Sequence, residues 1–361
     1  MQGYLECARN LFIFNSEKVK IFTMQVRKFL IKVAVFCLLN LVVLFSVLLF
    51  FSGRNRDIRL DVSDTESNLL ASGANEHYGV AFLGTSRGRV FSRDRNHQMV
   101  EAILGRRLIN LAKGGGGGLM PAKVHLAHFF SRGNRVDHIF YLVDPWVFFS
   151  AINNENNTFF LRDEPFELSI LLQLIADRFP LSALFSYLQM IAVDDWQTIS
   201  RYAGPGLTSG TLSLIDELKL EKAREHYLEL YVKKSFVRYC RFVDTSNELA
   251  RKNGSRITYI MLPLLIPDFP GIAEVDLKLK SAALSNSHVT YFNLAAAMQD
   301  RHFYYDHMHF NKKGISYFTK NVIDPILRGQ EPLSRTDCLF GSTQRQGEPV
   351  ETIRDYRVNS R

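Results

Sequence analysis

Two short segments, far apart in the chain, carry the residue types that acyl transfer to a serine requires. The first, Leu83 to Gly88 (LGTSRG), places Ser86 directly after a run of apolar residues. The second, Asp306 to Asn311 (DHMHFN), supplies Asp306 and His309 three positions apart. A serine hydroxyl becomes an effective nucleophile when a histidine takes its proton and a carboxylate orients that histidine. The two segments together hold the three parts of such a device.

The structural context of these segments is stronger evidence than their sequence motifs, because a G-x-S is expected about once by chance in a chain of this length. Ser86 lies between a predicted strand and a predicted helix, which exposes its hydroxyl at the sheet edge and points its backbone N–H into the site. Asp306 and His309 follow the last predicted strand, which returns them to the same edge. The alternative roles are a helix N-cap for Ser86 and a hydrogen-bonded histidine at a helix start for His309. The two segments support each other, so we favour the catalytic interpretation.

The composition indicates a folded protein with a substantial core. The chain has 361 residues, which allows one or two domains, and 47% of them are apolar. Lys and Arg number 44 against 36 Asp and Glu. These basic residues are scattered, and no predicted helix carries a basic stripe with interleaved aromatic residues, so a nucleic-acid partner is not expected. Attraction to anionic membranes or envelope polymers is the milder interpretation.

The four cysteines give no metal-binding pattern. Cys37 lies inside an apolar run and Cys7 precedes it, which leaves Cys240 and Cys338 in the remainder of the chain. These two have neither C-x-x-C spacing nor ligand companions, so we expect no zinc site and no other metal or organic cofactor. Two states remain open: a Cys240–Cys338 disulfide in an exported domain, or one buried thiol and one thiol in a loose tail.

An uncharged apolar run predicts a membrane anchor. Val33 to Phe51 is 19 residues long, and as a helix it would extend about 28 Å, close to the hydrocarbon core of a bilayer. It exceeds the apolar region of a signal peptide, and no A-x-A-like cleavage site follows it. Five basic residues precede the run and three follow it closely (Lys18, Lys20, Arg27, Lys28 and Lys32; Arg54, Arg56 and Arg59). This bias predicts a single-pass cell-membrane protein with a cytoplasmic N-terminus and an extracytoplasmic main domain. Met24 is an alternative start.

The remaining chain predicts an α/β domain. Five short apolar runs rich in β-branched or aromatic residues alternate with helical patterns, which is typical of a parallel sheet with helices on both faces. The predicted strands are 78–83, 107–111, 138–143, 257–263 and 289–294. The predicted segments are a cytoplasmic N-terminus (1–32), a transmembrane helix (33–51), a linker (52–77), the α/β domain (78–330) and a mobile tail (331–361).

One stretch of the domain, 147–226, breaks the alternation of strands and helices. Its segments Leu168–Ile175 and Pro180–Val193 are helical in pattern and strongly apolar. We predict a helical cap inserted above the carboxyl edge of the sheet, where open α/β sheets bind ligands. A structural excursion and a second membrane contact are the alternatives.

These blocks resemble those of the SGNH/GDSL hydrolases, over roughly residues 78 to 328 without the insertion. The early block reads Gly84-Thr85-Ser86, with Thr85 where the family has Asp, and the late block is Asp306 to Asn311 followed by Gly314. The resemblance implies a flavodoxin-like, three-layer α/β fold. It also implies that Ser86 is the nucleophile, that His309 is the general base and then the acid, and that Asp306 orients His309.

The resemblance further implies an oxyanion hole built from the nucleophile's N–H, a glycine of a second block and an asparagine of a third. A glycine run follows the second predicted strand, and its candidate oxyanion or substrate residues are Asn110, Gly114, Gly115 and Gly116. No G-K-[ST] follows, which disfavours a phosphate loop. In the third block Asp144 stands where asparagine is expected, and an ionised carboxylate has no N–H to donate. Either the hole is completed elsewhere or Asp144 has another role.

Three functions follow from these features. The chain is similar to an anchored, extracytoplasmic subset of the family that moves or removes acyl groups on cell-envelope polymers. The first hypothesis is therefore an esterase or O-acyltransferase whose partners are an acylated glycan or lipid substrate, the membrane and a membrane-bound acyl-donor protein. The second is a lipase-like esterase with an acyl pocket under the apolar helices. The third is a non-catalytic scaffold of an envelope assembly, which Thr85 and Asp144 favour and the intact Asp306–His309 block disfavours.

Overall fold

The computed structural model of the chain describes residues 23–51, 73–114, 117–157, 160–161, 166–192, 206–265 and 269–332. Five parallel strands form one sheet in the order β2-β1-β3-β4-β5. They are β1 (His77–Gly84), β2 (Leu108–Asn110), β3 (Arg135–Val143), β4 (Arg256–Met261) and β5 (Val289–Asn293). The sequence-based prediction of a flavodoxin-like parallel sheet is confirmed, and each strand lies within a few residues of its predicted position.

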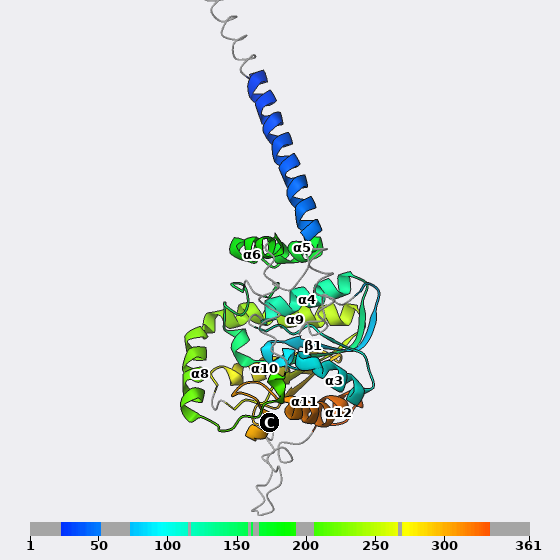
Figure 1. Cartoon of the computed structure of the whole chain (residues 1–361), viewed down its shortest axis with the longest axis vertical. Helices are drawn as coiled ribbons and strands as arrows, with labels where there is room; N and C mark the ends of the chain where they lie inside the picture. The colour runs from blue at the N-terminus through cyan, green and yellow to red at the C-terminus, as the bar shows by residue number, and fades with distance from the viewer. Residues whose placement is uncertain are drawn as a thin grey trace, which may run out of the picture.

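Helices cover both faces of the sheet (Figure 1). Helices α4 (Leu119–Ser131) and α9 (Phe236–Lys252) pack together on one face, and α10 (Ile272–Ser285) packs on β5. The other face carries α3 (Asn96–Leu104), α11 (Lys312–Phe318) and α12 (Asp324–Leu327). All five strands run parallel, but the chain adds β2 on one side of β1 and then β3, β4 and β5 on the other, which makes the junction of β1 and β3 a switch point. Ligands of open α/β sheets bind at the carboxyl ends of the strands at such a point.

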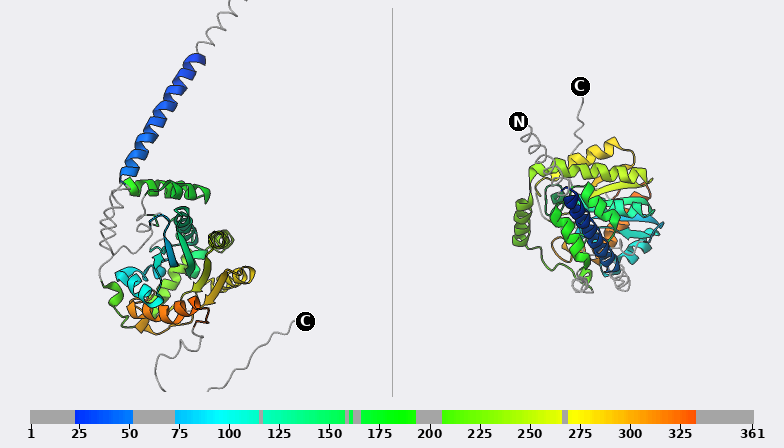
Figure 2. Two further views of the ribbon diagram at one scale, coloured as in Figure 1. Left: turned by 90° about the vertical axis from the view of Figure 1, so that its right-hand side faces the viewer. Right: turned by 90° about the horizontal axis from the view of Figure 1, so that it is seen from above.

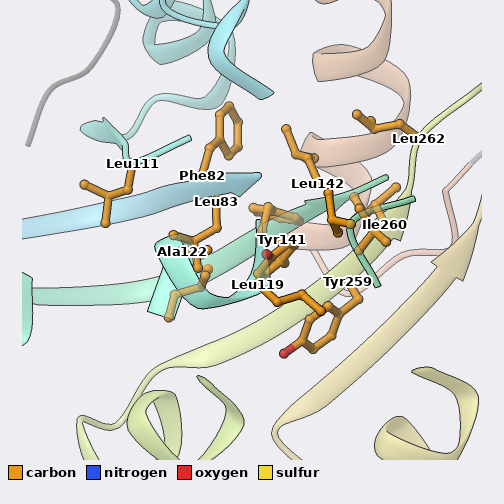
Figure 3. Close-up of a cluster of buried hydrophobic side chains, with 14 of the residues drawn as sticks. Phe82, Leu83, Leu111, Leu119, Ala122, Tyr141, Leu142, Tyr259, Ile260 and Leu262 are labelled. Carbon is orange, nitrogen blue, oxygen red and sulfur yellow. The ribbon is translucent and has the colours of Figure 1, made fainter. Parts of the chain in front are cut away.

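Alternate side chains of each strand fill the core on opposite sides of the sheet. Phe82 of β1 points to one side and Tyr259 of β4 to the other (Figure 3). Phe82 meets Phe91 edge-on with ring centroids 5.1 Å apart, in the layer of α3 and α11. Tyr259 stacks on Tyr141 of β3 at 5.4 Å and donates its hydroxyl to Asn247 of α9 over 2.8 Å. Burial on both faces explains why the central strands β1, β3 and β4 are mostly apolar.

The insertion divides into two parts that lie in different places. Its helices are α5 (Leu168–Ala176), α6 (Leu181–Ala192) and α8 (Glu217–Leu230). Helix α5 packs on the outer side of α4, where Lys123 Nζ contacts the carboxylate of Asp177 at 2.7 Å. Helices α5 and α6 therefore do not lie above the carboxyl edge, as the predicted cap requires, but beyond α4 (Figures 1 and 2). The stretch from residue 206 through α8 is the part that reaches the sheet edge.

Among the described residues, one helix, Thr23–Phe51, is long and apolar enough to cross a membrane. We call it the N-terminal helix. Its two polar side chains within the uncharged run bond to the helix backbone: Asn40 to the carbonyl of Phe36 at 2.7 Å, and Ser46 to that of Val42 at 2.9 Å. These bonds satisfy polar groups that would be costly in lipid. Most of the predicted mobile tail, most of the predicted linker and Cys338 lie outside the described residues, whereas Cys240 is a buried thiol on α9.

Candidate active site

The structure brings Ser86, His309 and Asp306 together in hydrogen-bonding contact. The His309 Nε2 atom lies 2.9 Å from Ser86 Oγ. On the other side of the ring, His309 Nδ1 lies 2.9 Å from Asp306 Oδ2 and 3.0 Å from Asp306 Oδ1. These three distances are within hydrogen-bonding reach, which proton transfer from Ser86 and orientation of the His309 ring both require. The arrangement can remove the Ser86 proton and stabilise the imidazolium that results.

The backbone before Ser86 depends on glycine. Strand β1 ends at Gly84 with φ +142°, a conformation that side chains rarely adopt, and a β-carbon there would lie 2.5 Å from the carbonyl oxygen of Leu142. Thr85 follows and caps the short helix α2 (Ser86–Arg89), because its hydroxyl accepts from the Arg87 amide at 3.3 Å. The chain therefore turns sharply between strand and helix, and Ser86 is the first residue of α2.

The segment with Asp306 and His309 is a tight turn that the carboxylate itself organises. Asp306 Oδ1 accepts from the backbone amides of Met308, at 2.8 Å, and His309, at 2.7 Å. The ring of Tyr305 lies parallel to that of His309, with centroids 5.5 Å apart. Asn311 caps α11 through its bond to the Gly314 amide at 2.9 Å. These contacts hold the imidazole between Ser86 and Asp306.

The electrostatics of the turn keep Asp306 ionised. Partial burial acts to raise the pKa of Asp306, but the hydrogen bonds and charge of His309, with the amides of Met308 and His309, outweigh it and lower that pKa. Burial raises the pKa of Tyr305 to about 12, so this ring stays neutral beside the histidine at ordinary pH. An ionised Asp306 fixes the proton of His309 on Nδ1 and leaves Nε2 free to accept from Ser86.

A buried ion pair lies next to Ser86. Arg87 is 3% exposed and Asp144 0%, and Arg87 Nη1 donates to Asp144 Oδ1 at 2.7 Å. The hydroxyl of Thr85 donates to the second oxygen of Asp144. Arg87 also donates through Nε to the carbonyl of Met308 at 2.9 Å, and through Nη2 to the carbonyl of Pro263. One guanidinium thus joins α2, the end of β3, the loop after β4 and the histidine turn.

This network explains Thr85 and Asp144, the two departures from the family pattern. Asp144 is a proposed oxyanion or substrate residue in the sequence interpretation, but its carboxylate is fully buried and accepts from Thr85 and Arg87. It is a counter-ion within the protein. Asn110 is also fully buried: its amide donates to the carbonyl of Gly88 at 3.1 Å and accepts from the Ala112 amide at 3.0 Å. Its bonds therefore join α2 to the loop after β2.

The glycine run closely approaches the backbone just before Ser86 at Gly117. A β-carbon at Gly117 would lie 2.5 Å from the Gly84 carbonyl and 2.6 Å from the Thr85 α-carbon. At Gly114 a β-carbon would meet the side chain of Arg89. Gly115 and Gly116, two of the predicted oxyanion residues, lie outside the described residues. Glycine is required at Gly117 because the loop backbone presses on the end of β1.

The second part of the insertion borders the histidine turn. His307 Nε2 accepts from the backbone amide of Asp216, which caps α8, at 3.0 Å. Tyr227 of α8 stacks on Trp146 with centroids 4.5 Å apart, and the Arg87 guanidinium lies 6.0 Å from the Trp146 ring. His307 is therefore occupied in holding the start of α8, and His309 is the histidine that faces Ser86.

A groove of about 590 Å³ lies beside the late block. Its lining includes Asn311 and Thr211, whose side chains are 3.5 Å apart, and the exposed lysines Lys312, Lys313 and Lys320. No triad residue lines it. Within the described part of the chain, no group of three or more His, Cys, Asp or Glu side chains has a metal-binding arrangement.

Two contributors to the site were not identified from the sequence. In the sequence Arg87 is only part of the early motif, and its one signal is a basic residue next to Ser86 in a chain whose Asp144 has no evident partner. Nothing in the sequence indicates a role for Tyr305 in the site except its position directly before Asp306. Both act through tertiary contacts, which one sequence does not display.

Comparisons with known proteins identify no family for this chain. No protein-family model and no curated protein matches the sequence. Among solved structures, the chain is similar to a Bacteroides fragilis protein classed by inference as an acylhydrolase, with a TM-score of 0.37 and 11% identity over 71% of this chain and 87% of that one. It is also similar to a family two carbohydrate esterase from Cellvibrio japonicus, with a TM-score of 0.32 and 12% identity over 74% of this chain and 64% of that one. Because both TM-scores are below 0.5, neither likeness indicates the activity of this chain.

Proposed function

We propose that this chain is a membrane-anchored serine esterase or O-acyltransferase that acts on acyl esters of a cell-envelope glycan. The observation that carries the proposal is the continuous contact from Ser86 Oγ through His309 to Asp306, with both links at 2.9 Å. The three groups come from two segments more than 200 positions apart, as the separation of 223 between Ser86 and His309 shows. A helix cap or a lone surface histidine needs no such alignment.

The reaction proceeds through an acyl-enzyme. Ser86 Oγ attacks the ester carbonyl while His309 Nε2 takes the hydroxyl proton, and the carbonyl electrons move onto oxygen. The carbonyl re-forms, the ester C–O bond breaks, and His309 returns the proton to the leaving alcohol. Water then attacks the acyl-Ser86 in a hydrolase, and a glycan hydroxyl attacks it in a transferase, with His309 again moving the proton.

The oxyanion of the tetrahedral intermediate requires donors that Asp144 does not supply. The backbone N–H of Ser86, at the start of α2, and amides of the glycine loop at 114–118 are the groups we assign to this task. The close approach of Gly117 to the end of β1 supports the assignment. Loss of one such donor typically reduces kcat by about 10²–10³.

The membrane and the basic groove support an envelope polymer as substrate. The N-terminal helix would hold the domain at the cell membrane, with a cytoplasmic N-terminus and the catalytic domain outside. Three exposed lysines line the groove beside Asn311, and a hydrated, anionic polymer suits such a surface better than an acyl chain does. Anchoring keeps the enzyme close to a membrane-bound acyl donor or acceptor. A lipase-like esterase would need α5 and α6 to cover an acyl pocket at the site. These helices lie beyond α4 instead, which disfavours that alternative.

The experiment uses the full chain in proteoliposomes with an O-acetylated polysaccharide. Acetate release and acetyl transfer to an unmodified glycan are measured for the wild type, Ser86→Ala, and the control Ser182→Ala, which changes an exposed serine of α6. We expect the wild type and Ser182→Ala to be active and Ser86→Ala to lose at least about 10³-fold in rate. Equal activity in all three proteins would contradict the serine mechanism.

A further inference from the structure

Helices α5 and α6 expose apolar side chains on their outer sides. Their exposed side chains follow helical spacing, so they form one stripe along each helix. We call this set the α5–α6 face: Leu168, Leu172 and Ile175 of α5, and Leu181 and Phe185 of α6, which are 51%, 55%, 54%, 70% and 66% exposed. Neither helix contains a charged residue. The opposite sides of the two helices are buried through Leu174 and Tyr187, among others.

The exposed leucines of α8 and α10 have a different setting. Leu218 of α8 and Leu284 of α10 are 65% and 90% exposed, but each helix carries several Lys and Glu or Asp residues. Single apolar side chains among charges are normal at a protein surface. Several large apolar side chains exposed on two neighbouring helices that carry no charged residue mark a surface that contacts something apolar.

The N-terminal helix ends on this part of the domain. Phe45 meets Phe166, just before α5, edge-on at 5.4 Å, and Phe166 stacks on Tyr187 of α6 at 5.8 Å. Leu48 is only 2% exposed. Figures 1 and 2 show α5 and α6 lying across the foot of the N-terminal helix, at the end of the domain that faces it.

The position of these contacts within the uncharged run indicates what lies against the α5–α6 face. Phe45 and Leu48 belong to the uncharged run, which ends at Phe51. At 1.5 Å per residue they lie about 9 Å and about 4.5 Å inside its end. Helices that lie in a membrane interface bury their apolar side about 5–10 Å below the headgroups. A domain that contacts the span at Phe45 and Leu48 thus holds α5 and α6 at interfacial depth.

We propose that the α5–α6 face lies in the lipid interface of the membrane that the N-terminal helix spans. The proposal rests on the span assigned under the proposed function. The partner is the glycerol and upper acyl-chain region of the phospholipid leaflet next to the catalytic domain. The domain is then docked on the membrane in one orientation and does not swing on its linker.

The layers set the height of the site above this membrane. Helices α5 and α4 lie between the face and the sheet, and each helix is about 10–12 Å thick with its side chains. The sheet, with Ser86 at the end of β1, therefore lies roughly 20 Å from the interface. At that height the site meets a polymer that extends from the membrane and not the ester bond of a bilayer phospholipid.

Photocrosslinking of the full chain in phospholipid vesicles tests the docking. Leu172 and Phe185 are each replaced by p-benzoylphenylalanine, and adducts with radiolabelled phospholipid are counted after illumination. Leu284, which is 90% exposed on α10, is the matched control for an exposed leucine on a charged helix. Leu39, 59% exposed on the N-terminal helix, is the control for the span itself.

We expect lipid adducts at positions 172 and 185 within about twofold of position 39 and at least about tenfold above position 284, since interfacial side chains touch acyl chains. Adducts at 39 with yields at 172 and 185 no higher than at 284 would overturn the docking and leave the span intact. Adducts with a second copy of the chain in place of lipid would also overturn it. If position 39 gave none, the span and the docking would both fail, while the triad chemistry would be unaffected.

Discussion

Replacing Arg87 with methionine tests the buried network behind Ser86. The substitution leaves the Asp144 carboxylate, 0% exposed, without its cation, and removes the donors to the carbonyls of Met308 and Pro263. Breaking a buried ion pair on one side costs about 3–5 kcal/mol. Each kcal/mol lowers Tm by about 2–4 °C in a domain of this size, so Arg87→Met should melt roughly 6–20 °C below the wild type.

The assay is thermal unfolding of the full chain in detergent, followed by intrinsic fluorescence. Arg328→Met is the matched control because Arg328, 65% exposed, pairs with Asp324 at 3.0 Å, and exposed pairs contribute at most about 1 kcal/mol. Arg87→Lys keeps the charge without the planar fork and should fall between the wild type and Arg87→Met. The double variant Arg87→Met, Asp144→Leu should melt above Arg87→Met alone, because it removes the uncompensated charge.

Two melting results would contradict the assigned role of the Arg87–Asp144 pair. If Arg87→Met melted within the range of Arg328→Met, the Arg87–Asp144 pair would not be the buried link described above. If the double variant melted no higher than the single one, an unpaired Asp144 would not be the cause of the loss.

Three further predictions concern the nucleophile turn, the choice of base and the orienting carboxylate. Gly84→Ala places a β-carbon 2.5 Å from a β3 carbonyl oxygen at φ +142°, so we expect a Tm decrease and loss of esterase activity in the same preparation. His309→Asn should reduce kcat by at least about 10³-fold. His307→Asn alters only the contact with α8, so its kcat should stay within about tenfold of the wild type. A larger loss of kcat in His307→Asn than in His309→Asn would show that His309 is not the base. The pKa of Asp306 is lowered in the folded state, so its stabilising contribution is complete above its ordinary value of about 3.9 and is lost as pH falls through the lowered pKa. The Tm difference between the wild type and Asp306→Asn should therefore narrow below about pH 4, and a difference that widened there would reverse the assigned sign.

The strands and the placement of Ser86 and His309 at one sheet edge could be predicted because their signals are local. Buried parallel strands read as short apolar runs, and a residue after such a run must lie at the carboxyl edge, which placed Ser86. The late block placed His309 by the same rule. Both inferences needed only the order of elements along the chain, and the structure brings the two residues to 2.9 Å.

The role of Asp144 and the place of α5 and α6 could not be predicted because they depend on partners distant in sequence. Asp144 follows β3 as expected, but only tertiary contact shows that Thr85 and Arg87 occupy its oxygens. The sequence shows that the segments of α5 and α6 are apolar. An apolar stripe alone, however, does not distinguish a helix that covers a cleft from one that contacts a membrane. Their contact with α4 shows that they do not lie above the carboxyl edge, and the nearness of Phe45 is one basis of the proposed membrane contact.

The most direct test of the central claim is labelling of the full chain with a fluorophosphonate, followed by peptide mapping of the modified serine. We predict that the wild type is labelled on Ser86 and that Ser86→Ala and His309→Asn are not, because only a serine with a working base attacks the phosphorus. The control Ser182→Ala should be labelled like the wild type. A folded wild-type chain that remained unlabelled, or carried the label on another serine, would contradict the catalytic assignment of Ser86, His309 and Asp306.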